Sequence, residues 1–299
     1  LKGSAREERF EPGHRVGIDS TVTDAPIHES SDSSLLWDGV RVMVGMLEQS
    51  RELAGAASLY YVNHRRVAKK RARAIWYARG ADRRGKLYRE LLKVTQATLG
   101  YVESVDACLK QAGVCGVGYE GWVSQVRYFC PLIKGVIEQT ERRVLAGEVV
   151  PAAEKVLSLF EPHTDIIVKG SRDVQYGHKL NLVSGRSGLI LDVVIERGNP
   201  ADVQRYLPML ERHCESYGMM PRQAAADGSY ASVEEMVKSK WVYRRLRNFR
   251  VGIEAGISCL KRTYGLARCT WKGLAHFEAY VWSSVVAYNL SVYARHRLA

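Results

Sequence analysis

One short strand pattern stands alone near the start of the chain and is followed by a long run of helical patterns. This order constrains the fold more than any other feature. Residues 15–22 predict a strand whose apolar part leads into Asp19. From Asp32 to about residue 160, apolar residues recur at helical spacing. Glycine-containing breaks divide this run near residues 80–85, 113–118 and 147–151.

The pattern changes after the helical run. Residues 173–183 alternate as a strand does, residues 184–188 are rich in glycine and serine, and residues 189–195 form a second apolar strand. Together they predict a β-hairpin. The remaining elements are expected in this order: a helix over 199–217 with Asn199 as its N-cap, a strand over 223–226, and helices over 231–240, 247–262 and 276–297.

This order of elements predicts an α/β (α+β) fold. Without the helical run, the chain reads as three strands, a helix, a fourth strand and more helices. That is the order of a ribonuclease H-like fold, a mixed sheet flanked by helices. We therefore expect residues 1–31 to hold the N-terminal segment and first strand of a catalytic domain. Residues 32–162 would be a basic, all-helical insertion, and residues 163–299 the remainder of that domain.

The chain is strongly basic, with a net charge of +12. Two clusters carry the excess, one from His64 to Lys93 and one from Lys238 to Arg262. One-sided charge repels itself unless a polyanion binds, so we expect a nucleic-acid partner and no membrane; the alternative is a solvated helix face. The residues of the first cluster expected to bind DNA are Arg65, Arg66, Lys69, Lys70 and Arg73. Trp76 and Tyr77 are expected to pack in a core.

The cysteines and the N-terminal residues bear on the cellular compartment. The six cysteines form no CxxC pair, so we expect reduced thiols that pack as small apolar side chains in a cytoplasmic protein. The first residues are charged from Lys2 onward, unlike a signal peptide. Because the sequence starts at Leu1 rather than Met, we expect it to be a fragment of a longer protein.

Three carboxylates stand where a metal-dependent phosphoryl-transfer site would need them. Asp19 follows the apolar part of the first strand, Asp227 follows the fourth strand, and Glu254 lies on the next helix. Parallel neighbouring strands would bring the two aspartates side by side, and hard ions such as Mg²⁺ prefer oxygen ligands. Arg250 and Lys261 fall within roughly 40° of the Glu254 face of that helix, which would place phosphate-binding cations beside a buried carboxylate. The alternatives are an ordinary i,i+4 Arg–Glu pair and turn-capping aspartates.

Other residues compete for these roles. Asp24, Asp32 and Asp38 are rivals of Asp19 for the first ligand position, although Asp32 reads better as a helix cap, and Asp192 is a reserve ligand. Three histidines are expected at the surface or in hydrogen bonds rather than on a metal: His28, His163 and His178. Lys169 and Lys179 are expected either to contact DNA or to be solvated strand residues.

The segment 247–262 resembles the C-terminal signature of DDE transposases of bacterial insertion sequences, Y-x2-R-x3-E-x6-K. Arg250, Glu254 and Lys261 match it, and Arg247 stands at the tyrosine position. The segments 18–39 and 226–232 are similar to the first and second acidic motifs of the same transposases, most closely the ISNCY-type group. The segments 261–266 and 271–277 extend the resemblance, which covers nearly the whole chain.

The resemblance implies a DNA transposase that cleaves at transposon ends and joins the freed 3′-hydroxyl to target DNA. It implies Asp19, Asp227 and Glu254 as the catalytic, metal-binding triad, with two Mg²⁺ (or Mn²⁺) ions. Arg250, Lys261 and the neighbouring Arg262 would hold DNA. It also implies a homodimer or higher oligomer on DNA, a nucleoid-associated location and a missing N-terminal DNA-binding region. The alternatives are a catalytically inactive DNA-binding remnant or regulator, and a ribonuclease H-like nuclease without strand transfer.

Overall fold

The computed structural model describes residues 10–28, 31–54, 59–168, 174–226 and 240–298. The chain is mixed α/β and divides into two compact units. One, here called the sheet unit, comprises the residues up to Pro26 and those from His163 onward. The other, the helical unit, comprises residues Ile27–Pro162. Among the described residues, no helix has the length and apolarity needed to cross a membrane.

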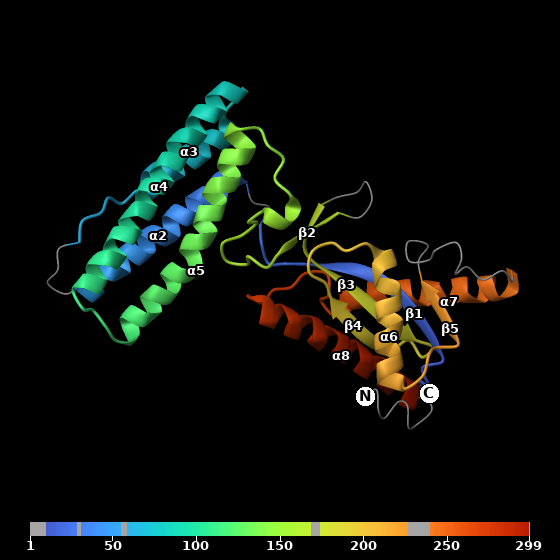
Figure 1. Ribbon diagram of the computed structural model, residues 1–299. Helices are drawn as coiled ribbons and strands as arrows, with labels where there is room; N and C mark the ends of the chain where they lie inside the picture. The colour runs from blue at the N-terminus through green and yellow to red at the C-terminus, as the bar shows by residue number, and fades with distance from the viewer. Residues whose placement is uncertain (1–9, 29–30, 55–58, 169–173, 227–239, 299) are drawn as a thin grey trace. The chain divides into compact units, whose positions relative to one another are not determined.

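A five-stranded mixed sheet forms the centre of the sheet unit (Figure 1). Its strands are β1 (Arg15–Asp24), β2 (Asp165–Val168), β3 (Val174–Gly185), β4 (Ile190–Ile195) and β5 (Gln223–Ala226). β3 pairs antiparallel with β1 along one edge and with both β2 and β4 along the other. β5 pairs with the free side of β1 in parallel, from Arg15↔Gln223 to Ile18↔Ala226. The predicted β-hairpin, β3–β4, and the predicted parallel pairing of the first strand with the strand over 223–226 are confirmed.

Helices cover both faces of this sheet. α6 (Tyr206–Tyr217) lies on one face, and α7 (Lys240–Thr263) and α8 (Leu274–Leu298) lie on the other (Figure 1). Neighbouring side chains of a strand point to opposite faces, so the sheet contributes apolar side chains to a separate core on each face. Val16 and Ile18 join the core under α6. Leu180 and Leu182 of β3 join the core under α7 and α8.

The helical unit is built from four helices around one apolar core: α2 (Asp32–Ala54), α3 (Arg65–Tyr77), α4 (Ala81–Gln111) and α5 (Val117–Thr140). α5 continues into a short π-helix, Glu141–Leu145, and a 3-10 turn follows at Ala152–Glu154. Trp122 is fully buried and its Nε1 donates a hydrogen bond to the carbonyl oxygen of Met46, 2.9 Å away. This contact ties α5 to α2.

The structure corrects several predicted elements. The helix expected over 199–217 begins only at Tyr206, after a 3-10 turn over Asp202–Arg205. Strand β2 was not expected, because four residues are too few to show an alternating pattern. Ser31, and not Asp32, caps α2, since its Oγ accepts a hydrogen bond from the amide of Ser34 at 3.2 Å. Of the helix expected over 231–240, all residues but the last lie outside the described ones.

Candidate active site and DNA-binding surface

Asp19 directly follows the last described pair of the parallel β1–β5 ladder. The sequence had suggested that Asp19 ends the first apolar strand. β1 instead continues to Asp24, so Asp19 lies in the middle of the strand. The described part of the β1–β5 ladder reaches Ile18↔Ala226, and Asp19 is the next residue of β1. Asp19 is half-buried, and its Oδ1 accepts a hydrogen bond from the amide of Ser20 at 2.7 Å. The neighbouring amide therefore orients the Asp19 carboxylate.

α7 packs closely on β1 at Gly17. A Cβ placed on Gly17 would lie 1.7 Å from Cδ1 of Ile253, so any larger residue would force this side chain to move. Asp19 is two residues further along β1 and thus points to the same face of the sheet as Gly17. Glu254 directly follows Ile253. The packing of Ile253 against Gly17 therefore fixes the part of α7 that carries Glu254 on β1, and α7 contacts both β1 and β5.

Glu254 already has a cationic partner. Its Oε1 accepts a hydrogen bond from Nη2 of Arg250 at 2.6 Å, the i,i+4 pair that the sequence allowed. The Glu254 side chain is 49% exposed, whereas the sequence had suggested a buried carboxylate. The difference arises because Glu254 lies beside, and not on, the stripe of α7 that packs on the sheet through Ile253 and Ile257.

Asp227, the third predicted ligand, lies outside the described residues. The described part of β5 ends at Ala226, the residue before it. Within the described part of the chain, no three or more His, Cys, Asp or Glu residues form a group that could hold a metal ion. The described part thus offers two of the three carboxylates that the triad needs.

Lys261 lies near Asp24, the last residue of β1. Burial lowers the pKa of the Lys261 ammonium group, and the Asp24 carboxylate acts in the opposite direction. Burial likewise raises the pKa of Asp24, against the effects of Lys261 and Arg268. The backbone of Asp24 is fixed by Ala267 and Cys269, through hydrogen bonds of 3.0 and 2.8 Å. Lys261 and Asp24 are therefore close enough to influence each other's charge. The neighbouring Arg262 is exposed, and its Nε lies 3.4 Å from the carbonyl oxygen of Ser258.

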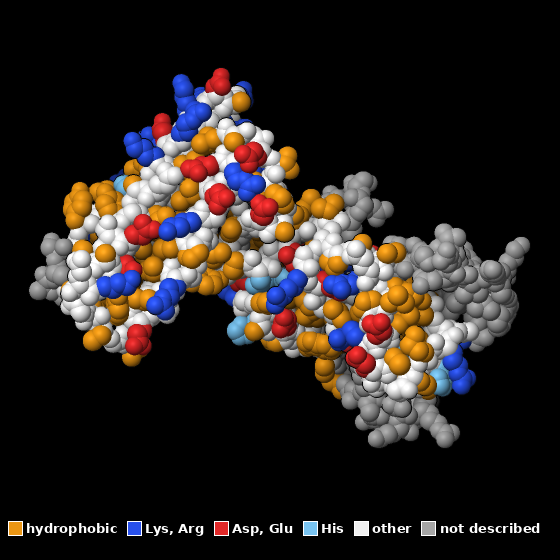
Figure 2. All heavy atoms as spheres, in the orientation of Figure 1, with side chains coloured by type: hydrophobic (Ala, Val, Ile, Leu, Met, Phe, Trp, Pro, Cys, Tyr) orange, Lys and Arg blue, Asp and Glu red, His pale blue; other side chains and the backbone are white. Residues whose placement is uncertain are grey.

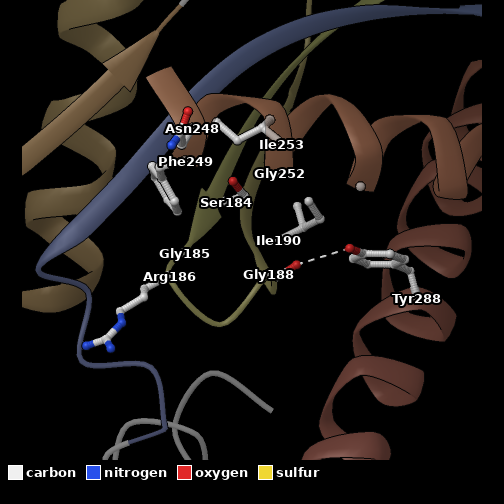
Figure 3. A pocket seen from close by; sticks show the side chains of 11 residues that line it. Ser184, Gly185, Arg186, Gly188, Ile190, Asn248, Phe249, Gly252, Ile253 and Tyr288 are labelled. Atoms are coloured by element: carbon white, nitrogen blue, oxygen red, sulfur yellow. Dashed lines mark hydrogen bonds between the residues drawn. The ribbon is translucent and has the colours of Figure 1, made fainter. Parts of the chain in front are cut away.

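A small cavity of about 210 Å³ adjoins this region (Figure 3). It lies between the β3–β4 hairpin and helices α7 and α8, and Phe249, Ile253 and Tyr288 form its apolar walls. The hydroxyl of Tyr288 donates to the carbonyl oxygen of Gly188 at 3.2 Å. This contact holds the hairpin turn against α8.

The predicted DNA-binding residues of α3 form an exposed stripe. Arg66, Lys69, Lys70 and Arg73 are exposed, and their spacing of three or four residues places them along one side of the helix. Opposite them, Ala68 and Ile75 are buried. Arg65 lies off the stripe and pairs with Glu48 at 2.8 Å. Basic side chains gather at the end of the helical unit where α3 meets α4 (Figure 2).

Trp76 and Tyr77 extend this stripe. The sequence had suggested that both pack in a core, and this is wrong: Trp76 is 76% and Tyr77 69% exposed. The reason is that Ile75 alone occupies the inward position of the last turn of α3. The guanidinium of Arg73 lies 6.0 Å from the centre of the Tyr77 ring. The basic stripe thus ends in two exposed aromatic rings.

The rival aspartates have structural partners. Asp32 is buried and pairs with Arg143 at 3.0 Å within the helical unit. Asp38 forms a surface pair with Arg41 at 2.9 Å, three residues later in α2. Asp192 faces α6, where both of its oxygens accept hydrogen bonds from Arg212, at 2.7 and 3.1 Å.

The remaining candidates are also placed. His163 and His178 share a hydrogen bond of 2.8 Å between Nδ1 and Nε2, and His28 is exposed, as the sequence had suggested for all three. Lys179 is buried and bonds to the Pro200 carbonyl oxygen and to Asp202, so it is neither solvated nor available to DNA. Lys169 lies outside the described residues. Of the six cysteines, Cys130 and Cys269 are buried as expected, whereas Cys108 and Cys115 are exposed.

The chain has no significant match to a known family model, to a curated protein or to a solved structure. Its function is therefore inferred from its residues and their arrangement. One cluster that sequence reasoning missed consists of Arg15, Arg186 and Arg222, which line one cavity. They are far apart in the chain, and no local pattern signals that they converge.

Proposed function

We propose that the protein is a DDE-type DNA transposase, which cleaves DNA at transposon ends and joins the freed 3′-hydroxyl to target DNA. One observation carries the proposal. The parallel β1–β5 ladder is described up to Ile18↔Ala226, Asp19 and Asp227 are the next residues in the sequence, and α7 packs on β1 through Ile253, the neighbour of Glu254. The resemblance to bacterial transposases requires the three carboxylates to converge, and this arrangement supports that expectation.

The topology of the sheet supports a ribonuclease H-like catalytic domain. β4, β3, β1 and β5 follow one another across the sheet, and only the β1–β5 pair is parallel. This order suits three antiparallel strands followed by a crossover helix, α6, and a parallel fourth strand. The helical unit lies in the sequence between β1 and β2, as an insertion would.

The chemistry of the donor set fits Mg²⁺ or Mn²⁺. Asp19 is half-buried and Glu254 exposed, and carboxylate oxygens are the ligands that these hard ions prefer. In this proposal Asp19, Asp227 and Glu254 hold two ions. Bound there, the ions would supply an activated water or 3′-hydroxyl and would stabilise the leaving oxygen of the phosphodiester.

The cations around the site have separate roles in this proposal. Arg250 orients Glu254 through their 2.6 Å hydrogen bond. Lys261 and Arg262, two turns further along α7, would bind the phosphates that flank the reacting one. The stripe on α3 would bind DNA independently of the metal site, through phosphate contacts of its basic residues and stacking on Trp76 and Tyr77.

A comparison of the rival aspartates tests the catalytic assignment. The substrates would be labelled duplexes that tile the DNA flanking the coding sequence, incubated with the full chain and Mn²⁺. Asp19→Asn and Asp227→Asn should abolish nicking, because each removes a metal ligand, while leaving DNA affinity nearly intact. Asp38→Asn makes the same chemical change at a surface carboxylate, and this variant should nick DNA as efficiently as the unchanged chain. Full nicking by either of the first two variants refutes the assignment.

Two outcomes would favour the other functions. A DNA-binding protein that has lost catalysis binds the duplexes without nicking any of them. A nuclease without strand transfer nicks DNA but gives no joined product when supplied with a pre-cleaved 3′ end. Joining of that end to a target duplex is the result that our proposal requires.

A further inference from the structure

A second cavity, of about 240 Å³, lies at the opposite end of the described β1–β5 ladder from Asp19. Three arginines from three separate segments line it: Arg15 at the start of β1, Arg186 in the β3–β4 turn, and Arg222 just before β5. Figure 3 shows the Arg186 side chain pointing away from the neighbouring apolar cavity and toward the segment that leads into β1.

Hydrogen bonds fix the backbone that presents these arginines. The carbonyl oxygen of His14 accepts from the amides of Arg222 and Gln223, at 2.8 and 3.2 Å, which ties the start of β5 to β1. Arg15 donates through Nε to Oε1 of Gln223 at 2.8 Å. The arginines are therefore presented by a preformed framework.

The buried carboxylate of Glu11 holds the turn that carries Arg186. Glu11 is fully buried, and its Oε2 accepts hydrogen bonds from the amide and the hydroxyl of Ser187, both at 2.7 Å. Its Oε1 accepts from the amide of Gly13 at 3.1 Å. With its oxygens bonded in this way, Glu11 positions the turn.

Among the described residues that line the cavity, positive charges outnumber negative ones. Three guanidinium groups stand against one carboxylate, Glu11. Among the described residues, neither Arg186 nor Arg222 has an ion-pair partner. Guanidinium groups held close together repel one another, and their planar forks bind phosphate oxygens in pairs. An anion with several oxygens is the ligand that relieves this repulsion.

We propose that this cavity binds a phosphate group of the DNA backbone. Arg15 and Asp19 are four residues apart on β1 and point to the same face, so about 13 Å separates them along the strand. Arg15 lies on the α7 side, since its guanidinium is 5.8 Å from the ring centre of Phe249. A DNA strand rises about 3.4 Å per nucleotide. The cavity would thus hold a phosphate about four nucleotides from the phosphodiester bond that the carboxylates cleave. The choice of DNA as the ligand rests on the proposed function.

The test uses the full chain in EDTA, so that cleavage does not enter. Arg186→Gln and Arg222→Gln are compared with Arg197→Gln, which removes the same charge from an exposed loop after β4. The first measurement is thermal unfolding in inorganic phosphate and in chloride at equal ionic strength. The second is affinity for a short duplex as a function of salt.

Phosphate should raise the melting temperature of the unchanged chain and of Arg197→Gln, but not of the two cavity variants, because a ligand of the folded state stabilises it. The cavity variants should also lose about 0.9 from the salt slope of duplex binding, the value for one phosphate contact. A phosphate effect without a duplex effect would overturn the DNA assignment and identify a free-phosphate site. Equal behaviour of all three variants in both measurements would overturn the proposal.

A further variant distinguishes failure of the phosphate cavity from failure of the proposed function. Glu254→Gln should lose nicking in Mn²⁺ yet keep both the phosphate effect and the salt slope in EDTA. Failure of the transposase assignment would therefore leave a functioning phosphate cavity. Failure of the cavity would leave metal-dependent nicking in place.

Discussion

At the scale of single residues, two glycines set how closely the elements of the sheet unit approach each other. A Cβ on Gly17 would overlap Ile253, whose side chain can rotate at some cost. A Cβ on Gly177 would lie 2.0 Å from the backbone oxygen of Thr23, which cannot move without shifting β1 itself. Gly177 pairs with Asp24, so this close approach positions the end of β1 beside Lys261.

Gly177→Ala should therefore destabilise the fold by about 1–3 kcal/mol, the range of overpacked cores. Gly252→Ala is the matched control, because no described atom lies within 4 Å of its added Cβ. In the helix it should be neutral or stabilising by up to about 1 kcal/mol. Urea unfolding of both variants measures the difference. Equal midpoints would show that the β1–β3 approach is looser than the structure has it.

Cys130 gives the helical unit a pH dependence. Burial raises the pKa of its thiol from 9.0 to about 11. Between these values the unfolded chain releases this proton while the folded chain keeps it, so stability should fall as the pH rises through the window. Cys130→Ala should show a smaller loss of urea midpoint between pH 8 and pH 10.5 than the unchanged chain. Identical losses would mean that the thiol is not buried.

At the scale of elements, sequence patterns predicted the positions of strands and helices that bury one apolar face. They did not predict the exposure or partners of side chains that depend on how the elements pack together. The strand at 223–226 and the helix containing Glu254 were predictable, because their apolar residues are local signals. The exposure of Trp76 was not, since an amphipathic pattern does not show which side of α3 faces the other helices. The partner of Lys261 was equally hidden, because Asp24 is distant in sequence and meets it only through the packing of α7.

The exposed stripe of α3 should contribute to DNA binding. Lys70→Glu combined with Arg73→Glu should weaken duplex binding and lower its salt slope by about 1.8, the value for two phosphate contacts. Arg127→Glu combined with Lys155→Glu changes the charge equally on another part of the helical unit. Fluorescence anisotropy over a range of salt concentrations compares the two. Equal salt slopes for the two double variants would show that the stripe is a solvated helix face that does not contact DNA.

At the scale of the whole molecule, the division into two units predicts separate folding. The helical unit has its own core, which includes Trp122, Leu47 and Leu91. A fragment comprising residues 27–162 should therefore be helical by circular dichroism, unfold cooperatively and retain duplex binding. A fragment that is unfolded, or that binds no DNA, would contradict the prediction that the helical unit folds and binds DNA on its own.

The central claim is that Asp19, Asp227 and Glu254 meet at the end of the β1–β5 ladder and bind a pair of metal ions. A crystal structure with DNA and Mn²⁺, in which anomalous scattering locates the ions, tests it most directly. We predict two Mn²⁺ about 4 Å apart, each held by at least one of these carboxylates. Mn²⁺ bound elsewhere, or any one of the three carboxylates turned away from the ions, would contradict it.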